Sequence, residues 1–370
     1  MRLHMRNQMG DYRVTVVDSM SEWLALGELW NGVLQNSISD TVFLTYEWLS
    51  TWADCFLGRD RKLFILAVYD KSELVGAGPF YINSIRFGVF PLKQLEFLGL
   101  PEAGSDYLDV LAKKGKEKQV ALCIYDFLFN EVSQLWDCLM LRDIPSNSLF
   151  LLHFSDRIRQ EGKYAETTQG SFCPSVLLPK TEDELFSGLS ANRRALFRRH
   201  LRMLGVEAEL THSSATVHEA GPDFDDFKSF CRANKAHCDD ELLSFIEAFA
   251  LKCGEKNWVQ IDTLSSNGKS IAGLLHLRYG NELYMYIMAT DKAFNPKVSV
   301  GNVLVGLCIK NAVNHGIHVY DFLKGAEDYK FSWSNCGRSS TRFLFCQKKL
   351  IPLLLMASRF MKYSAKMLLR

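Results

Sequence analysis

The order of sequence patterns repeats along the chain, and this repetition constrains the fold more than any single motif. In the first half, SEWLALGELWNGVLQN has the apolar spacing of an amphipathic helix, a second helical stretch covers 46–56, and two β-rich runs flank a polar turn at 70–72. In the second half, helical patterns over 223–256 precede three strand-like runs, which Asn267-Gly268 and Gly280-Asn281 separate. We therefore predict two copies of one α/β unit.

A short similarity between the halves supports the repeat. ELVGAG at 73–78 and KSIAGL at 269–274 occupy corresponding second strands. Between the halves, SFCPSVLLPKTEDE places two prolines around a short apolar run, and Thr181 with Glu184 forms a capping box at a new helix. We predict an N-terminal domain over 1–175, a C-terminal domain over 176–347 and a basic amphipathic helix over 348–370.

Composition excludes several classes of protein. A chain of 370 residues exceeds one ordinary core, and its net charge of +1 argues against a nucleic-acid-wrapping protein. The ten cysteines show no CxxC or Cys/His spacing, so we expect reduced thiols and no metal. The start of the chain has no apolar signal segment, and no apolar run is long enough to span a bilayer. We expect a cytoplasmic protein.

An arginine-rich helix is predicted at SANRRALFRRHLRML, residues 190–204. Arg194, Arg198 and Arg202 recur at intervals of four and form one stripe beside an apolar face. The interpretations are a solvated helix paired with acids elsewhere, a substrate-binding surface, and a nucleic-acid-binding stripe, which the nearly neutral overall charge disfavours. In the second, Arg194 and Arg198 bind a phosphorylated or carboxylated ligand, because guanidinium groups bind such anions bidentately.

A second helix start is a candidate cofactor-binding site. After a loop at 291–298, the small-residue turn at Ser299, Val300, Gly301 and Asn302 opens a helix that ends at Gly316. The exposed N–H groups and positive dipole of a helix start can hold a pyrophosphate. Most such turns are only caps, so this interpretation competes with a purely structural one.

The stretch HVYDFLKGAEDYKFSW, residues 318–333, follows this helix directly. Its alternation places Val319, Asp321 and Leu323 on one face. An aspartate among core residues needs a partner, which is either a nearby backbone turn or another group such as a lysine, an amide or a substrate. Ligands meet open α/β sheets just beyond strand ends. The candidates at this strand end are Asp321, Lys324, Glu327, Tyr329 and Lys330.

The first half has a comparable loop. In EFLGLPEAGSDYLDVLA, residues 96–112, glycines and a proline precede Asp106. Asp106 is either a general base or the former of an Asx turn.

The C-terminal segment 348–370 is basic and amphipathic, with six basic residues and no acid. Such a helix either lies on an anionic membrane surface or packs against the protein body. The first alternative predicts peripheral contact with the inner face of the membrane.

Together these motifs resemble a known family. SVGNVL at 299–304 and YDFLKGAEDYKFSW at 320–333 carry the resemblance, with weaker support from 190–204 and from GSDYLDVL at 104–111. The chain resembles, over most of its length, the FemAB-related branch of the GNAT acyltransferases, which includes CelD-type proteins of cellulose and exopolysaccharide biosynthesis. Val300 stands where the family pattern has a proline.

The resemblance implies an α/β fold of two tandem GNAT-like (acyl-CoA N-acyltransferase) units, with mixed central sheets flanked by helices. It implies acyl transfer from a thioester to an amine or hydroxyl, with the donor where strands 282–290 and 317–323 splay and its pyrophosphate at Ser299–Asn302. The chain lacks the glycine-rich phosphate loop of ordinary GNAT enzymes. FemAB relatives use aminoacyl-tRNA, so the donor is acetyl-CoA, another acyl-CoA or, in the alternative, aminoacyl-tRNA.

Hypothetical roles follow for the candidate residues. Asp106 or Asp321 orients or deprotonates the acceptor, and Glu327 is an alternative base. Tyr329 hydrogen-bonds the leaving group, and Lys324 or Lys330 stabilises negative charge on donor or acceptor. We expect a sugar, a polysaccharide precursor or a related small molecule as acceptor. The rival hypothesis from another class is a non-catalytic scaffold in a polysaccharide-assembly complex.

Overall fold

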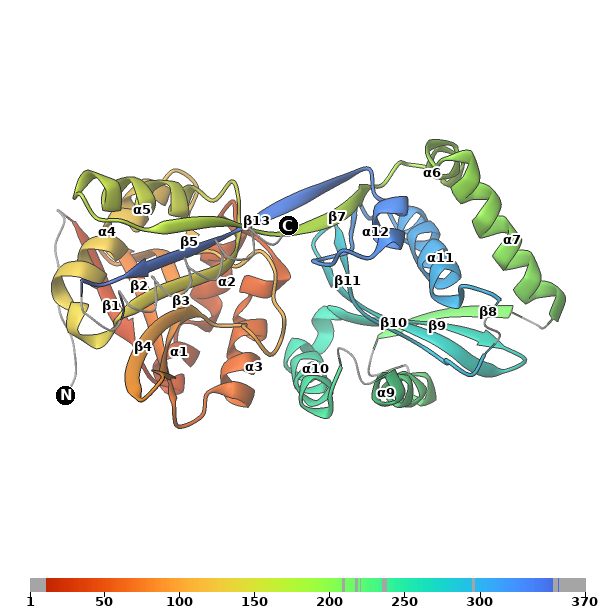
Figure 1. The fold of residues 1–370 in the computed structure, drawn as a ribbon, viewed down its shortest axis with the longest axis horizontal. Helices are drawn as coiled ribbons and strands as arrows, with labels where there is room; N and C mark the ends of the chain where they lie inside the picture. Colours follow the sequence, from red (N-terminus) through yellow and green to blue (C-terminus); the bar gives the residue numbers. More distant parts are fainter. Residues whose placement is uncertain are drawn as a thin grey trace. The chain divides into compact units, whose positions relative to one another are not determined.

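The chain folds into two compact units (Figure 1). The computed structural model describes residues 11–207, 210–216, 219, 221–234, 238–294, 297–348 and 352. The first unit comprises Met1–Gly170 and Ser339–Arg370, and the second comprises Ser171–Arg338. The boundary near 170 lies close to the predicted one at 175. Residues 339–347, predicted to belong to the C-terminal domain, fall in the first unit instead.

The first unit buries an unusually aromatic helical layer. Four tryptophans from its first three α-helices have no exposed surface: Trp23, Trp30, Trp48 and Trp52. The tryptophans there are packing residues. The helices are α1 (Met20–Leu24), α2 (Gly27–Gln35), α3 (Tyr46–Phe56), α4 (Glu117–Asp126) and α5 (Leu149–Gln160), with short turns η1 (Val42–Leu44), η2 (Phe127–Glu131) and η3 (Ser133–Leu135).

The sheet of the first unit is mixed. Its strands are β1 (Tyr12–Val17), β2 (Arg61–Asp70), β3 (Glu73–Phe87), β4 (Phe90–Phe97), β5 (Leu111–Ala112), β6 (Cys138–Pro145) and β13 (Cys336–Cys346), of which the last begins in the second unit. The neighbours run β1-β2-β3-β4-β6-β13, and β5 pairs with β3. All pairs are antiparallel except β4 with β6. The hairpin predicted around 70–72 is the β2–β3 turn, where Lys71 has φ of 55°.

The second unit has the same plan. Its helices are α6 (Glu182–Gly188), α7 (Ala191–Glu207), α9 (Pro222–Asn234), α10 (Asp240–Cys253), α11 (Val300–Asn314) and α12 (Asp328–Trp333), with the turn η4 (Gly254–Lys256). Its strands are β7 (Glu166–Leu177), which starts in the first unit, β8 (Leu210–Thr216), β9 (Val259–Ser266), β10 (Lys269–Tyr279), β11 (Glu282–Thr290) and β12 (Val319–Asp321). The neighbours run β7-β12-β11-β10-β9-β8.

The predicted meander is β9–β10–β11, and its tight turns carry positive φ at Asn267, Gly268 and Gly280. Strand β12 then joins β11 in parallel, as β6 joins β4 in the first unit. In each unit one helix connects that parallel pair, α4 in the first and α11 in the second. The short similarity between 73–78 and 269–274 lies at the starts of β3 and β10. The repeated order in the sequence therefore corresponds to a repeated topology.

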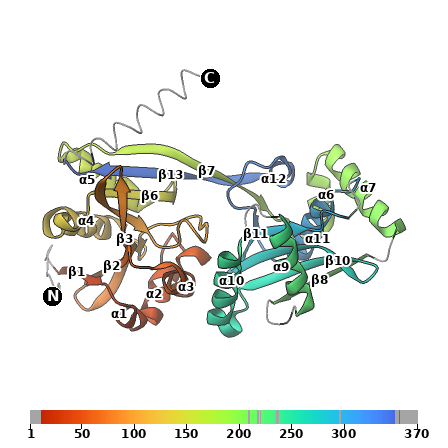
Figure 2. The same ribbon diagram turned by 60° about the horizontal axis from the view of Figure 1, so that its bottom comes forward.

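Helices cover both faces of the second sheet. Helix α11 lies on one face, and α9 and α10 lie on the other (Figure 1, Figure 2). The core on the α11 side includes Val303, Leu304 and Ile309 of α11, together with Phe197 of α7 and Trp333 of α12. Most residues of α11 are buried because the helix packs against the strands and also against α6 and α7.

Helix α11 ends as predicted, since Gly316 has φ of 69°. The predicted basic helix at 348–370 lies outside the described residues, apart from residues 348 and 352. Within the described part of the chain, no helix is both long enough and apolar enough to cross a bilayer.

Candidate active site

A cavity of about 310 Å³ lies at the start of α11. Its walls come from the end of β11, the segment that follows it, the first turn of α11 and one residue of α12. The lining residues are Met288, Thr290, Asp291, Lys292, Phe294, Val298, Ser299, Val300, Gly301, Asn302 and Tyr329.

The strand pairing opens the sheet beside this cavity. Only Glu282–Tyr284 of β11 pair with Val319–Asp321 of β12, and β11 continues alone on that side to Thr290. Parallel strands that separate in this way leave backbone and side chains accessible at their carboxyl ends. The splayed pair expected at 282–290 and 317–323 is therefore present, although β12 is shorter than predicted.

The predicted cofactor-binding residues all line the cavity. Ser299 is the N-cap of α11, and Val300, Gly301 and Asn302 form the first turn. The first turn of a helix offers N–H groups that have no partner within the helix. A Cβ on Gly301 would lie 3.0 Å from the Met288 sulfur, so a glycine lets this turn approach the end of β11 closely. This arrangement can accept an anionic group.

Tyr329 is the predicted catalytic residue that lines the same cavity. Burial, and to a lesser extent the nearby Glu327 carboxylate, raises the pKa of the Tyr329 phenol above its ordinary value. The phenol consequently stays protonated at neutral pH and can donate a hydrogen bond.

Asp321 is fully buried at the end of β12. Its Oδ1 accepts a hydrogen bond from the backbone N–H of Leu323 at 2.8 Å. Leu323 has φ of 55° and has already left the strand, so the predicted alternation extends only from Val319 to Asp321. Of the two interpretations of Asp321, the backbone turn is present, and a role toward substrate stays a prediction.

Lys330 closes the loop that precedes α12. Its buried ammonium donates to the carbonyl of Lys324 at 2.9 Å and lies 3.2 Å from Oε2 of Glu327. Gly325 has φ of 151°, and a Cβ there would collide with both Lys330 and Glu327. Lys330 and Glu327 therefore hold the loop in shape, and the side chain of Lys324 is half-buried beside them.

The predicted arginine helix is α7, and its arginines have different surroundings. Arg194 donates to the carbonyls of Phe186 and Ser187, each at 3.1 Å, and so caps the end of α6. Arg198 is exposed. Their assignment as substrate-binding residues stays a prediction, and Arg194 already has a structural role.

Arg193 is the residue that the sequence interpretation missed. It is only 8% exposed. Its guanidinium carbon lies 4.2 Å from the centroid of the Trp333 ring. Its Nη2 donates a hydrogen bond to Oδ1 of Asn302 at 3.0 Å. Asn302 in turn donates to the Ser299 hydroxyl oxygen at 2.8 Å. Arg193 is therefore connected through the Asn302 amide to the Ser299 hydroxyl at the start of α11.

The Arg193 charge has no ion-pair partner among the described residues, and its Nε has no hydrogen-bond partner there. Burial lowers the pKa of Arg193 to about 10, so the guanidinium remains charged at neutral pH. A buried charge without a counter-ion is costly unless a ligand supplies one. A sequence signal existed, because Arg193, Phe197 and Leu201 recur at intervals of four and Arg193 thus lies on the apolar face.

Asp106 belongs to the other unit. It is buried in the segment between β4 and β5, only 2% exposed. Its proposed role as a base stays a prediction, and within its own unit it is one of several buried carboxylates.

Comparisons with known proteins agree with this geometry. Residues 191–331 match the family described as an acetyltransferase (GNAT) domain, a segment that lies wholly within the second unit. No curated protein matches the sequence.

Among solved structures, FemX is similar with a TM-score of 0.60 and 11% identity, over 89% of this chain and 98% of that one. L-PGS from Bacillus licheniformis gives a TM-score of 0.53 with 11% identity, over 95% and 97% of the two chains. The C-terminal domain of a putative lysylphosphatidylglycerol synthetase from Agrobacterium fabrum gives 0.52 with 10% identity, over 91% and 96%.

These findings establish the enzyme class. The second unit is a GNAT acetyltransferase-type domain, and the protein is an acyltransferase. The predicted mixed α/β fold is confirmed, and the similarity to FemX extends over both units. At 10–11% identity the solved structures bear on the fold alone, and the narrower CelD-type resemblance stays a prediction.

Proposed function

We propose that the second unit transfers an acyl group from acyl-CoA, with acetyl-CoA as the donor, to an amine or hydroxyl of a sugar or polysaccharide precursor. The observation that carries the proposal is the cavity at the start of α11, backed by the unpaired charge of Arg193. The sugar acceptor rests on the family resemblance of the sequence motifs.

The donor phosphates would lie against the first turn of α11. Backbone N–H groups and the helix dipole favour an anion there. Arg193 holds the Asn302 amide in one orientation, with Oδ1 toward the guanidinium and Nδ2 toward Ser299. The Ser299 hydroxyl accepts that bond and keeps its own hydrogen for a ligand. A phosphate at this point would also supply the counter-charge that Arg193 lacks.

The chemistry is direct transfer. The acceptor nitrogen or oxygen attacks the thioester carbonyl carbon, the carbon–sulfur bond breaks, and the acceptor proton passes to a base or to water. The thiolate of CoA leaves and takes a proton from the Tyr329 phenol, which solvent then reprotonates. Among the candidate catalytic residues, Tyr329 is the one whose side chain lines the cavity.

The other candidate residues have proposed roles toward the acceptor and the developing negative charge. In the second unit, Asp321 orients or deprotonates the acceptor, with Glu327 as the alternative base, and Lys324 stabilises negative charge. Asp106, in the first unit, keeps its predicted role as a base. Lys330 acts on substrate through the shape of the 324–330 loop, because its ammonium is bound within that loop.

Thermal unfolding with ligands tests the donor. Acetyl-CoA at 100 times its dissociation constant adds about 2.7 kcal/mol to the free energy of unfolding and should raise the Tm. Acetyl-pantetheine, which carries the thioester without the pyrophosphate, should raise it far less. Arg193→Leu should lose most of the acetyl-CoA shift, whereas Arg199→Ala, an exposed arginine on the same helix, should keep it. The donor assignment is wrong if no acyl-CoA raises the Tm of the wild type.

Aminoacyl transfer from aminoacyl-tRNA is the second candidate. It rests on the resemblance of the sequence motifs to the FemAB-related branch, and the similarity of fold to FemX and to the lysylphosphatidylglycerol synthetase over about nine tenths of the chain is compatible with it. Filter binding with aminoacylated and deacylated tRNA distinguishes the two donors. Selective retention of the aminoacylated form, without any acyl-CoA effect on the Tm, would replace the first candidate by this one.

A further inference from the structure

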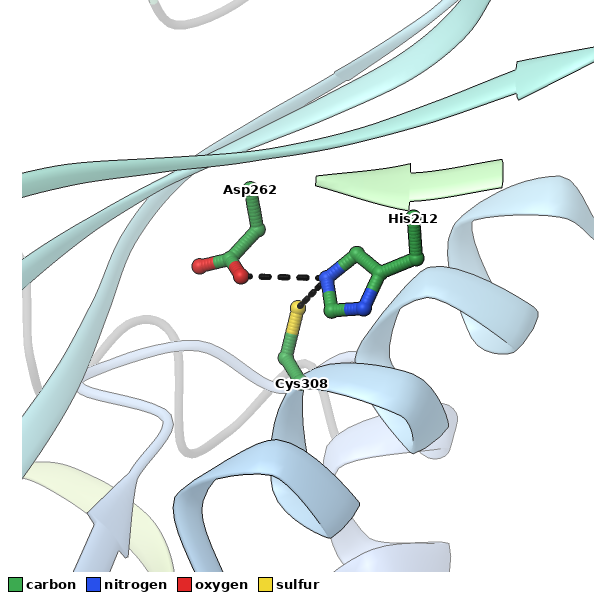
Figure 3. A group of neighbouring side chains, drawn as sticks. All are labelled: His212, Asp262 and Cys308. Atoms are coloured by element: carbon green, nitrogen blue, oxygen red, sulfur yellow. Dashed lines mark hydrogen bonds and ion pairs between the residues drawn. The ribbon is translucent and has the colours of Figure 1, made fainter. Parts of the chain in front are cut away.

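Three side chains of the types that bind metal ions lie close together on the α11 side of the second sheet (Figure 3). His212 comes from β8, Asp262 from β9 and Cys308 from α11. Nε2 of His212 lies 3.1 Å from Oδ1 of Asp262 and 3.9 Å from Sγ of Cys308, and the three atoms all lie within 4.8 Å of one another. Asp262 and Cys308 are 50 and 96 residues from His212, so no local spacing reveals the cluster.

The arrangement does not fit a nucleophilic triad. In such a triad the nucleophile contacts one ring nitrogen of histidine and the carboxylate contacts the other. Here Asp262 and Cys308 both approach Nε2 of His212, as Figure 3 shows. One nitrogen cannot donate its proton to the carboxylate and also remove a proton from the thiol.

The spacing fits a tetrahedral ion. Zinc binds histidine nitrogen and carboxylate oxygen at about 2.0–2.1 Å and thiolate sulfur at about 2.3 Å, so tetrahedral angles place N and O about 3.3 Å apart and N and S about 3.6 Å apart. The observed separations of 3.1 and 3.9 Å differ from these by a few tenths of an ångström. Three protein ligands leave a fourth position for water.

Hydrogen bonds to its second oxygen fix the Asp262 carboxylate, as is usual for carboxylates that bind metal ions. Oδ2 of Asp262 lies 2.8 Å from Nδ1 of His276 and accepts from Nε2 of Gln260 at 2.8 Å. The other nitrogen of His276 lies 2.8 Å from the Tyr320 hydroxyl. Oδ1 of Asp262 is thereby directed toward His212 and Cys308.

Charge balance also suits a divalent cation. Asp262 and Cys308 are each 1% exposed, so two of the three groups lie away from solvent. A divalent ion would displace the thiol proton and balance one carboxylate and one thiolate at a buried point. The His212 side chain, 19% exposed, provides the side from which an ion can enter.

We propose that His212, Asp262 and Cys308 bind one divalent ion of the zinc type, with a water as fourth ligand. The bound ion ties α11, whose first turn lines the candidate active site, to β8 and β9. This inference is independent of the proposed acyl donor.

Cobalt substitution tests the site directly. The full-length protein, stripped with a chelator, is titrated with Co²⁺ and followed by absorption. We expect one equivalent to bind with a thiolate-to-cobalt charge-transfer band in the near ultraviolet and visible bands of tetrahedral intensity, and Zn²⁺ to displace it and raise the Tm. Cys308→Ser should abolish the charge-transfer band, while Cys253→Ser, a buried cysteine of α10 in the same unit, should retain it.

His276→Leu provides a second readout, because loss of the group behind Asp262 should weaken metal affinity about 10- to 100-fold. The proposal is overturned if the wild type gives no charge-transfer band with Co²⁺, or if the band persists unchanged in Cys308→Ser. Neither result bears on acetyl-CoA binding, so the two proposals fail separately.

Discussion

Two buried cations of the second unit show how the partners of a residue indicate its role. Lys330 is paired within its own loop, to the Lys324 carbonyl and the Glu327 carboxylate. Arg193 is equally buried, yet it contacts a ring, an amide and no carboxylate among the described residues. Lys330 therefore has a structural role within its loop, whereas the charge of Arg193 has no carboxylate partner among the described residues.

Tyr329 provides a test of chemistry at the residue scale. We expect Tyr329→Phe to lower kcat about 100-fold, because a general acid contributes on the order of 10²–10⁴ in rate, and to leave KM for the donor nearly unchanged. Steady-state kinetics of CoA release measure both constants. An unchanged kcat would remove Tyr329 from the leaving-group role.

Asp109 provides a test of pH dependence. It is buried and accepts hydrogen bonds from Ser39 at 3.0 Å, from Ser148 at 2.9 Å and from the backbone N–H of Val110. Desolvation outweighs these bonds and raises the pKa of Asp109 to about 6. The folded state therefore binds the proton more tightly than the unfolded state, and this contribution to stability is present below about pH 4 and is lost as the pH rises toward 6.

Asp109→Asn should remove that contribution, which amounts to roughly 3 kcal/mol at about 1.4 kcal/mol for each unit of pKa. Urea unfolding between pH 4 and 7 measures it as the difference between variant and wild type. Asp18→Asn, an exposed aspartate of the same unit, serves as the control. A constant difference across this pH range would show that Asp109 titrates normally.

At the scale of elements, the packing of α11 against α7 depends on a glycine. A Cβ on Gly306 would collide with the ring of Phe197, which is itself packed against Trp333. Gly205, on α7, has open space around its Cβ position. The same substitution should therefore have opposite effects at the two positions.

Gly306→Ala should destabilise the protein by about 1–3 kcal/mol through overpacking. Gly205→Ala should be neutral or stabilise it by up to about 1 kcal/mol, because alanine is the better helix former. Chemical unfolding of both variants measures the pair. Equal effects would mean that α7 and α11 do not pack as described.

Elements with local signals could be predicted from the sequence, and elements with distant partners could not. The hairpins and the meander followed from turn residues such as Asn267-Gly268, and α11 followed from its apolar spacing. The placement of residues 339–347 in the first unit could not be predicted. Strand β13 pairs with β6, some 200 residues earlier, and the sequence of a short strand does not indicate such a distant partner.

At the scale of the whole molecule, the same distinction applies to the sites. Ser299–Asn302 and Tyr329 belong to motifs that were singled out in the sequence, and they line the cavity, whereas their binding and catalytic roles stay predictions. Arg193 was missed, although its position on the apolar face of α7 gave a signal, and His212, Asp262 and Cys308 meet only through the fold. The two units share a topology, and the cavity at the start of α11 belongs to the second one.

The central claim is acyl transfer from acetyl-CoA at the start of α11. The most direct test incubates the full-length protein with carbon-labelled acetyl-CoA and a small-molecule extract from cells that lack it, and follows the label by mass spectrometry. We predict a labelled sugar or glycan precursor with the wild type and with Arg199→Ala, and its loss with Arg193→Leu. A label that appears equally with Arg193→Leu, or no labelled acceptor with any variant, would contradict the account.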